Sequence, residues 1–315
     1  MNMPIFKVVK PGLQTTVQDL GRYGYRKYGV SPSGAMDTYS LQMGNLLVGN
    51  KLGEPVLEVP FIGPVLWALH DVSIAICGGN LSPKINEQAI PLWKSLVIKK
   101  GQYLSFGKII QGARAYISIA GGIQVPQVLA SKSTYLTGKF GGLDGRALEK
   151  GDILYGHPLA RRNRFLHESL IPNYPNELTV SVIMGPHIEK FTSFGVQTFL
   201  NDEYILSPQS NRMAFQLNGP IIEHSSGADI ISDTIPLGGI QVPASGRPII
   251  LMAEHQTTGG YSRIGTVIST DITRLAQALP GTKIRFKEIS IQSAQNLLID
   301  SRKKIKCLYS LSRSL

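Results

Sequence analysis

Short runs of β-branched and aromatic residues, each ended by glycine or proline, are the feature that most constrains how this chain folds. The 33 glycines and 19 prolines among 315 residues suit strands that are joined by tight turns. Strands at such short intervals are typical of a β-barrel or a β-sandwich. The expected strands are Ile5–Lys10, Val56–Val59, Val65–Leu69, Val72–Cys77, Trp93–Ile98, Gln102–Phe106, Arg114–Ile119, Ile153–Tyr155, Thr179–Met184, Glu203–Leu206, Ala214–Leu217, Gly239–Val242, Pro248–Ala253, Thr266–Ser269 and Ile284–Glu288.

Few segments carry apolar residues at helical spacing. Asp37 suits the N-cap of the first of them, and Asp271 or Thr270 suits the cap of the third. For Asp37, the cap and a catalytic carboxylate are equal alternatives at this point. The expected helices are Thr38–Leu47, a weak one around Pro126–Leu129, Asp271–Leu279, and an amphipathic one at Ser290–Leu298.

The length suits two domains of ordinary size. The segment 156–178 has three prolines, three arginines and no periodicity, so it is the candidate boundary. Gly121–Pro126 reads GGIQVP, and the same six letters recur at Gly238–Pro243, after a β-branched run in both cases. We therefore expect two related β-barrel units: residues 1–160, a linker at 161–178, and residues 179–315 with a C-terminal helix.

The formal net charge is +11, which favours acidic partners of any kind. The clusters at Arg161, Arg162 and Arg164 and over the last fifteen residues lack the interleaved aromatic residues of single-strand nucleic-acid binders, so solvated charges are the preferred interpretation. Cys77 and Cys307 lie far apart, which indicates a reduced compartment. No apolar run suits a signal peptide or a membrane span, so a cytoplasmic protein is expected, without nucleic-acid or membrane partners.

Several common chemistries lack their motifs. The chain has no GxxxxGK[ST] phosphate loop, no GxGxxG after a strand, no HExxH and no GxSxG. Its six histidines show no metal-ligand spacing, so no metal site is expected on this chain. These absences weigh against the common ATPase, dehydrogenase, metalloprotease and serine hydrolase classes.

Two polar stretches remain as candidates for a site. Leu13–Asp37 is a long loop with hydrogen-bond donors and a carboxylate, and long loops in compact domains are usually functional. Within Glu223–Phe286, polar side chains surround Gly259-Gly260, an expected turn whose N–H groups can hold an anion. In the same stretch His224 and Ser225 suggest a nucleophilic pair, but adjacent residues seldom act on each other, so a turn is favoured. The glycine-rich turn Thr137–Arg146 is a third anion candidate, with a surface hairpin slightly preferred.

Two long motifs carry a family resemblance. PGLQTTVQDLGRYGYRKYGVSPSGAMD near the start and SSGADIISDTIPLGGIQVPASGRPIILMAEHQTTGGYSRIGTVISTDITRLAQALPG near the end resemble the KipA family. Members of that family are also named as the C subunit of 5-oxoprolinase or as the second subunit of allophanate hydrolase, and they belong to the biotin-dependent carboxyltransferase superfamily. The resemblance covers about Phe6 to Leu298. It implies a mainly β chain of two cyclophilin-like β-barrel units with a few short helices, and it does not imply prolyl isomerase activity.

The resemblance also implies a function. The chain would be the C subunit of an ATP-dependent 5-oxoprolinase, which opens 5-oxo-L-proline to L-glutamate together with a KipI-type B subunit and with an A subunit. ATP, with Mg²⁺, would be held by the complex. The alternatives are a regulatory KipI-binding protein that antagonises a histidine-kinase inhibitor, and a carboxyltransferase component that acts on a urea-like substrate. The chain has no biotin-accepting lysine, so any biotin would come from elsewhere.

In this family setting the candidate residues take roles. The catalytic candidates are Arg22, Asp37, Glu254 and Gln256, and the substrate- or nucleotide-binding candidates are Gln14, Ser33, Lys139, Arg146, Gln241, Thr257, Gly259, Gly260 and Tyr261. Family members often carry Asp-Arg where this chain has Glu254-His255. A fixed positive charge is thereby replaced by a titratable one, which implies weaker or pH-dependent activity if that position binds substrate.

Overall fold

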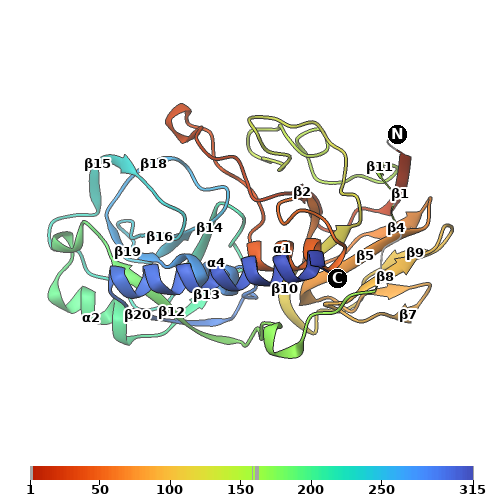
Figure 1. Cartoon of the computed structure of the whole chain (residues 1–315). Helices are drawn as coiled ribbons and strands as arrows, with labels where there is room; N and C mark the ends of the chain where they lie inside the picture. The colour runs from red at the N-terminus through yellow and green to blue at the C-terminus, as the bar shows by residue number, and fades with distance from the viewer. Residues whose placement is uncertain (1–2, 158, 160–162, 315) are drawn as a thin grey trace. The chain divides into compact units, whose positions relative to one another are not determined.

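The computed structural model describes residues 3–157, residue 159 and residues 163–314 (Figure 1). Arg161, Arg162 and part of the expected linker lie outside the described residues. The chain forms two compact units. Unit 1 comprises Met1–Tyr23, Ser33–Tyr174 and Cys307–Leu315, and unit 2 comprises Gly24–Pro32 and Pro175–Lys306. The short segment 24–32 therefore belongs to a different unit from the residues that flank it.

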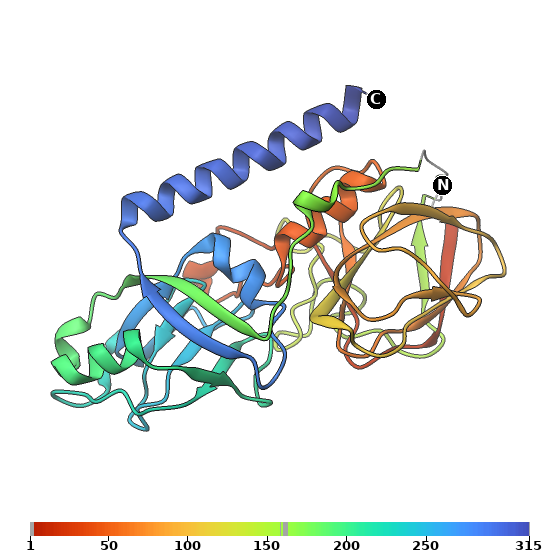
Figure 2. The ribbon, with the colours of Figure 1, turned by 90° about the horizontal axis from the view of Figure 1, so that it is seen from below.

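Unit 1 is built from two sheets, whose strands run in colour from red through orange to yellow-green in Figure 2. The first has the strand order β11-β1-β4-β9-β6-β7 and the second β2-β3-β10-β5-β8. The strands are β1 (Met3–Lys10), β2 (Thr16–Gln18), β3 (Val56–Pro60), β4 (Val65–Ala68), β5 (Val72–Asn80), β6 (Lys84–Ile85), β7 (Gln88–Ala89), β8 (Ser95–Ile98), β9 (Tyr103–Ser105), β10 (Gln111–Ile119) and β11 (Ile153–Gly156).

The core of unit 1 is formed by aliphatic side chains of both sheets, among them Ile5, Leu57, Ile74 and Ile117. Helix α1 (Thr38–Leu47) packs against β5 and β10. Both strands are therefore buried along almost their whole length, including the polar residues Ser73 and Arg114.

Unit 2 is a closed barrel with the strand order β12-β19-β16-β17-β14-β13-β20. Its strands pair antiparallel except for β12 with β20, which run parallel from Glu177↔Lys283 to Val182↔Glu288. Apolar residues alternate with exposed ones along β12 and β20, as expected where one face of a strand lines a core. The strands are β12 (Glu177–Met184), β13 (Tyr204–Leu206), β14 (Ala214–Asn218), β16 (Gly239–Gln241), β17 (Ile249–Leu251), β19 (Arg263–Val267) and β20 (Lys283–Glu288).

Further elements accompany the barrel. Strands β15 (Asp229–Thr234) and β18 (Thr258–Tyr261) form a separate two-stranded ribbon. Unit 2 also contains the helices α2 (Ser193–Asn201) and α3 (Ser269–Leu275) and the single 3₁₀ turns η1 (Arg26–Tyr28) and η3 (Ile188–Lys190). The 3₁₀ turn η2 (Glu168–Leu170) belongs to unit 1, and helix α4 (Ile291–Ser314) belongs to unit 2 up to Lys306 and to unit 1 from Cys307. Among the residues that the structure describes, no helix combines the length and the apolar character needed to cross a membrane.

The mainly β fold with few helices is confirmed, and α1 has the expected bounds and cap. The helix expected around Pro126–Leu129 is wrong: Val128 forms an isolated bridge with Ser131, and Leu129 and Ala130 have positive φ angles of 52° and 60°. A right-handed helix cannot contain two left-handed residues.

Two other helices differ in their bounds. Helix α3 begins at Ser269 after Ile268, so Asp271 lies inside it instead of capping it, and accepts a hydrogen bond of 2.8 Å from the Ser181 amide. Helix α4 continues far beyond Leu298. The basic residues after Leu298 are good helix formers with no proline or glycine among them, so the expected tail is helical.

The turn expected at Gly259-Gly260 is also wrong. Both glycines lie in strand β18, where Gly259 pairs with Asp233 of β15. Neither has a positive φ angle, so backbone conformation does not require glycine here; at Gly259 the reason is space.

Candidate functional site

Ile235 of unit 2 is the centre of a group of polar side chains from four segments. We call Arg26, Gln241, His255, Gln256 and Gly259, together with Ile235, the Ile235 cluster. Its carbonyl oxygen lies near Arg26 and His255, and its side chain lies near Gln241 and Gly259. Four of the sequence-predicted residues are thereby brought together, because Tyr261 joins the cluster through its carbonyl oxygen.

The amide groups of the cluster come from β16 and from the loop before β18. Gln241 is 4% exposed and donates from Nε2 to the Tyr261 carbonyl at 3.2 Å. The exposed Gln256 approaches Gln241 Oε1 with its Nε2 at 3.5 Å, and no other partner is recorded for Gln256 among the described residues. The buried amide of Gln241 and the exposed amide of Gln256 are thus neighbours, and only that of Gln256 is open to solvent.

Glycine at position 259 leaves the space that the Gln241 amide needs. A Cβ atom there would stand 2.5 Å from Ile235 Cδ1 and 2.8 Å from Gln241 Nε2. At Gly260 the nearest atom would be 3.6 Å away, which is an ordinary contact. Thr257 lies beside the same residue, because its carbonyl accepts a hydrogen bond of 3.1 Å from the Ile235 amide.

The other side of the cluster is formed by His255 and Arg26. His255 is almost fully buried, with Nδ1 at 2.6 Å from the Met252 carbonyl and Nε2 at 3.1 Å from the Ile235 carbonyl. Burial lowers the pKa of His255 and the Arg26 guanidinium lowers it further, although the two carbonyl acceptors oppose this. Arg26 also donates to the Ile235 carbonyl, and Ser31 of the same segment donates to the Ala253 carbonyl at 3.2 Å.

Glu254 points to a different partner. Its Oε1 lies 2.7 Å from Nε of Arg212, and the two side chains are only 2% and 6% exposed. A buried carboxylate with a charge-assisted hydrogen bond is held in one position. The catalytic role expected for Glu254 stays a prediction.

The histidine near the expected Ser–His pair contacts another serine. His224 Nε2 lies 3.1 Å from Ser262 Oγ and from the Val242 carbonyl, while Ser225 donates to the Glu189 carbonyl. His224 and Ser225 therefore make no contact of the kind that activates a nucleophile, as the turn interpretation expected.

In unit 1, Arg22 is fully buried. It donates to the Ser133 carbonyl, and its guanidinium carbon lies 4.9 Å from the centre of the Phe140 ring. Nearby, the Asp19 carboxylate accepts hydrogen bonds from Gly21, Ser131, Lys132 and Ser133. Arg22 and Asp19 both hold the segment 131–140 against the loop at 19–22. The catalytic role of Arg22 stays a prediction.

Asp37 caps α1 and is 1% exposed. Its carboxylate accepts from the Ser40 amide at 3.0 Å and from the Ser40 hydroxyl at 2.6 Å. Its amide donates to the Tyr116 hydroxyl, which in turn donates to Glu58 at 2.9 Å. Burial raises the pKa of the Tyr116 hydroxyl, so this hydroxyl stays protonated at neutral pH.

The remaining predicted residues of unit 1 are spread over its surface and loops. Gln14 and Lys139 are exposed, and Ser33 is buried with a positive φ angle of 52°. Arg146 forms two hydrogen bonds with the Asp152 carboxylate, at 2.8 and 2.9 Å. That pairing lowers the pKa of Asp152 and satisfies much of the donor capacity of Arg146. Their binding roles stay predictions.

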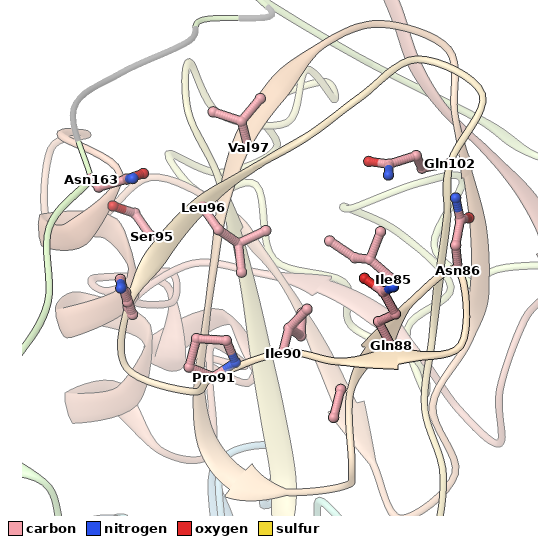
Figure 3. A pocket seen from close by; sticks show the side chains of 12 residues that line it. Ile85, Asn86, Gln88, Ile90, Pro91, Ser95, Leu96, Val97, Gln102 and Asn163 are labelled. Atoms are coloured by element: carbon pink, nitrogen blue, oxygen red, sulfur yellow. The ribbon is translucent and has the colours of Figure 1, made fainter.

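Unit 1 also contains a cavity of about 550 Å³. Figure 3 shows Leu96 and Val97 on one side of it, Ile85 and Gln102 on the other, and Ile90 between them. None of the predicted site residues lines this cavity. Within the described part of the chain, no group of His, Cys, Asp and Glu side chains is arranged to hold a metal ion.

Sequence reasoning missed Arg26, Arg212 and the partly buried Arg263, whose guanidinium donates to the Thr234 carbonyl at 2.9 Å. Arg26 and Arg22 stand four residues apart in one loop, and no local signal separates the arginine of unit 1 from that of unit 2. Arg212 lies in an ordinary polar turn, so only its contact with Glu254 reveals it.

Residues 28–288 match the carboxyltransferase domain family, subdomains A and B. The chain belongs to this family. It is 35% identical to the C subunit of the Escherichia coli 5-oxoprolinase over 92% of this chain and 93% of that protein. It is also 34% identical to the C subunit of the Haemophilus influenzae 5-oxoprolinase, over 90% and 91%. The resemblance to these 5-oxoprolinase proteins and to the carboxyltransferase superfamily is thus confirmed.

Larger proteins contain the same fold. The crystal structure of the Kluyveromyces lactis urea amidolyase matches 97% of this chain with a TM-score of 0.92 and 32% identity. This chain spans only 20% of that protein. The urea amidolyase of Saccharomyces cerevisiae is 33% identical over 96% of this chain, which corresponds to 18% of the yeast protein. In the carboxyltransferase family this fold therefore occurs both as a separate chain and as a section of a longer one.

Proposed function

We propose that this chain is the C subunit of an ATP-dependent 5-oxoprolinase, which converts 5-oxo-L-proline to L-glutamate together with the A and B subunits. The observation that carries the proposal is the match to proteins named as the C subunit of 5-oxoprolinase, which covers almost all of this chain and of each of those proteins. The names of those relatives imply other chains, and this chain is proposed to be active only with them.

The chemistry explains why ATP is needed. A lactam is stabilised by resonance, so water attacks it slowly. Transfer of the γ-phosphoryl group of ATP to the lactam oxygen releases ADP and produces an activated imidate. Water then adds to the imidate carbon, the ring C–N bond breaks, and phosphate is released with the glutamate. The charge that develops needs fixed hydrogen-bond donors, and the amides of Gln241 and Gln256 are suited to contact a lactam group. ATP and its Mg²⁺ are proposed to be held by the complex, and no biotin is proposed on this chain.

The test is reconstitution. The chain is co-expressed with its cognate A and B subunits, and glutamate formed from 5-oxoproline is measured with and without ATP. We expect ATP-dependent glutamate from the complex and almost none from the single chain. An intact complex that forms no glutamate would contradict the proposal.

Gln256→Ala provides the residue-level test, with Gln209→Ala as its matched control, because Gln209 lies in a turn of unit 2 that has no predicted role. We expect turnover to be lost only in Gln256→Ala, while both variants still assemble with their partners. Unchanged turnover in Gln256→Ala would remove this residue from the proposed site.

A second candidate is a carboxyltransferase component that acts on a urea-like substrate. It is favoured by the match to urea amidolyases over nearly the whole chain. Transfer of a carboxyl group to urea from a biotinylated partner, in place of glutamate formation, would decide for this alternative.

A further inference from the structure

Arg26 is the one cation of the Ile235 cluster that no carboxylate neutralises among the described residues. Its recorded hydrogen bond is the one to the Ile235 carbonyl. The two other arginines of this part of unit 2 have acidic partners: Arg212 pairs with Glu254 at 2.7 Å, and Arg263 lies 4.0 Å from Asp233. A partly buried guanidinium has lost part of its hydration, and an anionic ligand restores that loss.

The surroundings of Arg26 give it a fixed position. The Ile235 carbonyl that it contacts is also contacted by His255, and the Ile235 amide donates to the Thr257 carbonyl at 3.1 Å. The backbone at Ile235 is thus held on both sides. A guanidinium that is anchored by one N–H group presents its remaining N–H groups as a fork, which matches the two oxygens of a carboxylate.

The amides of the cluster complement this cation. Ile235 connects the two parts of the cluster: Arg26 contacts its carbonyl oxygen, and its Cδ1 atom and Gln241 Nε2 bound the space beside Gly259. The exposed Gln256 has an amide oxygen and an N–H group without a recorded partner among the described residues. A glutamine amide offers N–H donors and an oxygen acceptor, which are the groups that pair with the C=O and N–H of a lactam or a primary amide.

We infer that Arg26 is the specificity-determining residue of the unit 2 site: it binds a carboxylate of the substrate, while Gln256 contacts an amide or lactam group of the same molecule. This inference rests on the proposed function for the identity of the substrate. It also separates the two candidate functions, because 5-oxoproline carries a carboxylate and urea does not.

The test compares two ligands that differ only in the carboxylate: 5-oxo-L-proline and 2-pyrrolidinone. Binding of each to the assembled complex is measured by titration calorimetry without ATP. We expect the intact protein to prefer 5-oxoproline by about 10- to 100-fold, the usual effect of a charge-assisted hydrogen bond. Arg26→Gln removes the guanidinium charge, so we expect the preference for 5-oxoproline over 2-pyrrolidinone to be lost.

Lys27→Gln is the matched control. It removes the same charge at the next position, where the ammonium lies 5.0 Å from the centre of the Tyr28 ring and has no recorded contact with Ile235. The control should keep the full preference, and Arg26→Lys, which keeps the charge without the planar fork, should keep part of it. Thermal unfolding of each variant verifies that the fold is intact.

The outcomes separate this inference from the proposed function. If the complex forms glutamate and Arg26→Gln still prefers 5-oxoproline, the inference is wrong and the function stands. If no glutamate is formed but the preference exists and depends on Arg26, the carboxylate site stands and the function is wrong. An equal loss of preference in Lys27→Gln would show a nonspecific effect of charge and would overturn the inference, as would the absence of any preference in the intact protein.

Discussion

At the scale of single residues, the structure separates charges that are neutralised within the fold from charges that remain available. Glu254 and Arg212 form a buried pair, Arg146 pairs with Asp152, and Arg26 has no acidic partner among the described residues. The sequence named Glu254 and Arg22 as catalytic candidates and Arg146 as a binding candidate, without separating paired from unpaired charges. Burial and pairing, which depend on the folded contacts, are what distinguish them.

The Glu254–Arg212 pair provides a stability prediction. Arg212→Met leaves the Glu254 carboxylate buried without its partner, so we expect a loss of about 3–5 kcal/mol in the free energy of unfolding. The double variant Arg212→Met/Glu254→Gln should recover much of that loss. Urea unfolding curves with a constant slope would measure both. If the loss in the double variant equalled the sum of the losses in the two single variants, Arg212 and Glu254 would not stabilise each other.

His255 provides a prediction of pH dependence. Its pKa in the folded chain is lowered from 6.5, so the folded state keeps it neutral. Below pH 6.5 the unfolded chain binds a proton that the folded chain does not, and stability is therefore lost as the pH falls from 6.5 toward the folded pKa. His255→Gln should remove this dependence, and the melting temperatures of both proteins between about pH 7.5 and 5.5 would show it. If the melting temperatures of the two proteins changed in parallel with pH, His255 would bind protons equally in the folded and unfolded states.

At the scale of elements, the start of α1 is predicted correctly from the capping residue Asp37, but this does not decide whether Asp37 is also catalytic. The helix begins after Asp37, as the sequence predicts, and the carboxylate accepts from the Ser40 amide and hydroxyl. The same residue lies beside a buried network that contains Tyr116 and Glu58, so a cap and a reactive group remain compatible with one position.

The substitutions Asp37→Asn and Asp37→Ala separate these roles. Asparagine is as good an N-cap as aspartate, whereas alanine costs about 0.5–2 kcal/mol. If Asp37 is only a cap, Asp37→Asn keeps both stability and turnover in the complex. A large loss of turnover in a stable Asp37→Asn variant would instead establish the carboxylate as catalytic. Chemical denaturation and glutamate formation measure the two effects separately.

At the scale of the whole molecule, the division into units does not follow the order of the chain. Unit 2 takes the segment 24–32 from within the sequence of unit 1 and uses it to place Arg26 and Ser31 beside its barrel. The sequence predicts one boundary near the middle of the chain. It does not predict that the segment 24–32 belongs to unit 2, because this loop has no periodicity that would assign it to a unit, nor that Cys307–Leu315 belongs to unit 1.

A fragment of residues 175–306 tests this arrangement. This fragment contains every strand of the barrel but lacks the hydrogen bonds from Arg26 and Ser31. We therefore expect its free energy of unfolding to be about 2 kcal/mol lower than that of a barrel with the segment 24–32, the usual sum for two such bonds. Joining residues 22–34 to its N-terminus through a flexible linker should restore part of the loss. Equal urea midpoints for both fragments would show that the segment adds nothing to the barrel.

The sequence by itself determined the mainly β fold, most strands, helix α1 with its cap and the family, because these depend on local periodicity, turn residues and long motifs. The tertiary structure decided which polar residues meet. The repeated hexapeptide is an example: Gly239 begins barrel strand β16 in the second copy, whereas in the first copy the equivalent Gly122 has a positive φ angle and only Ile123 forms a bridge. Identical letters adopt different structures because strand pairing is set by distant partners, and the same is true of the partners of Arg22, Arg26 and Glu254.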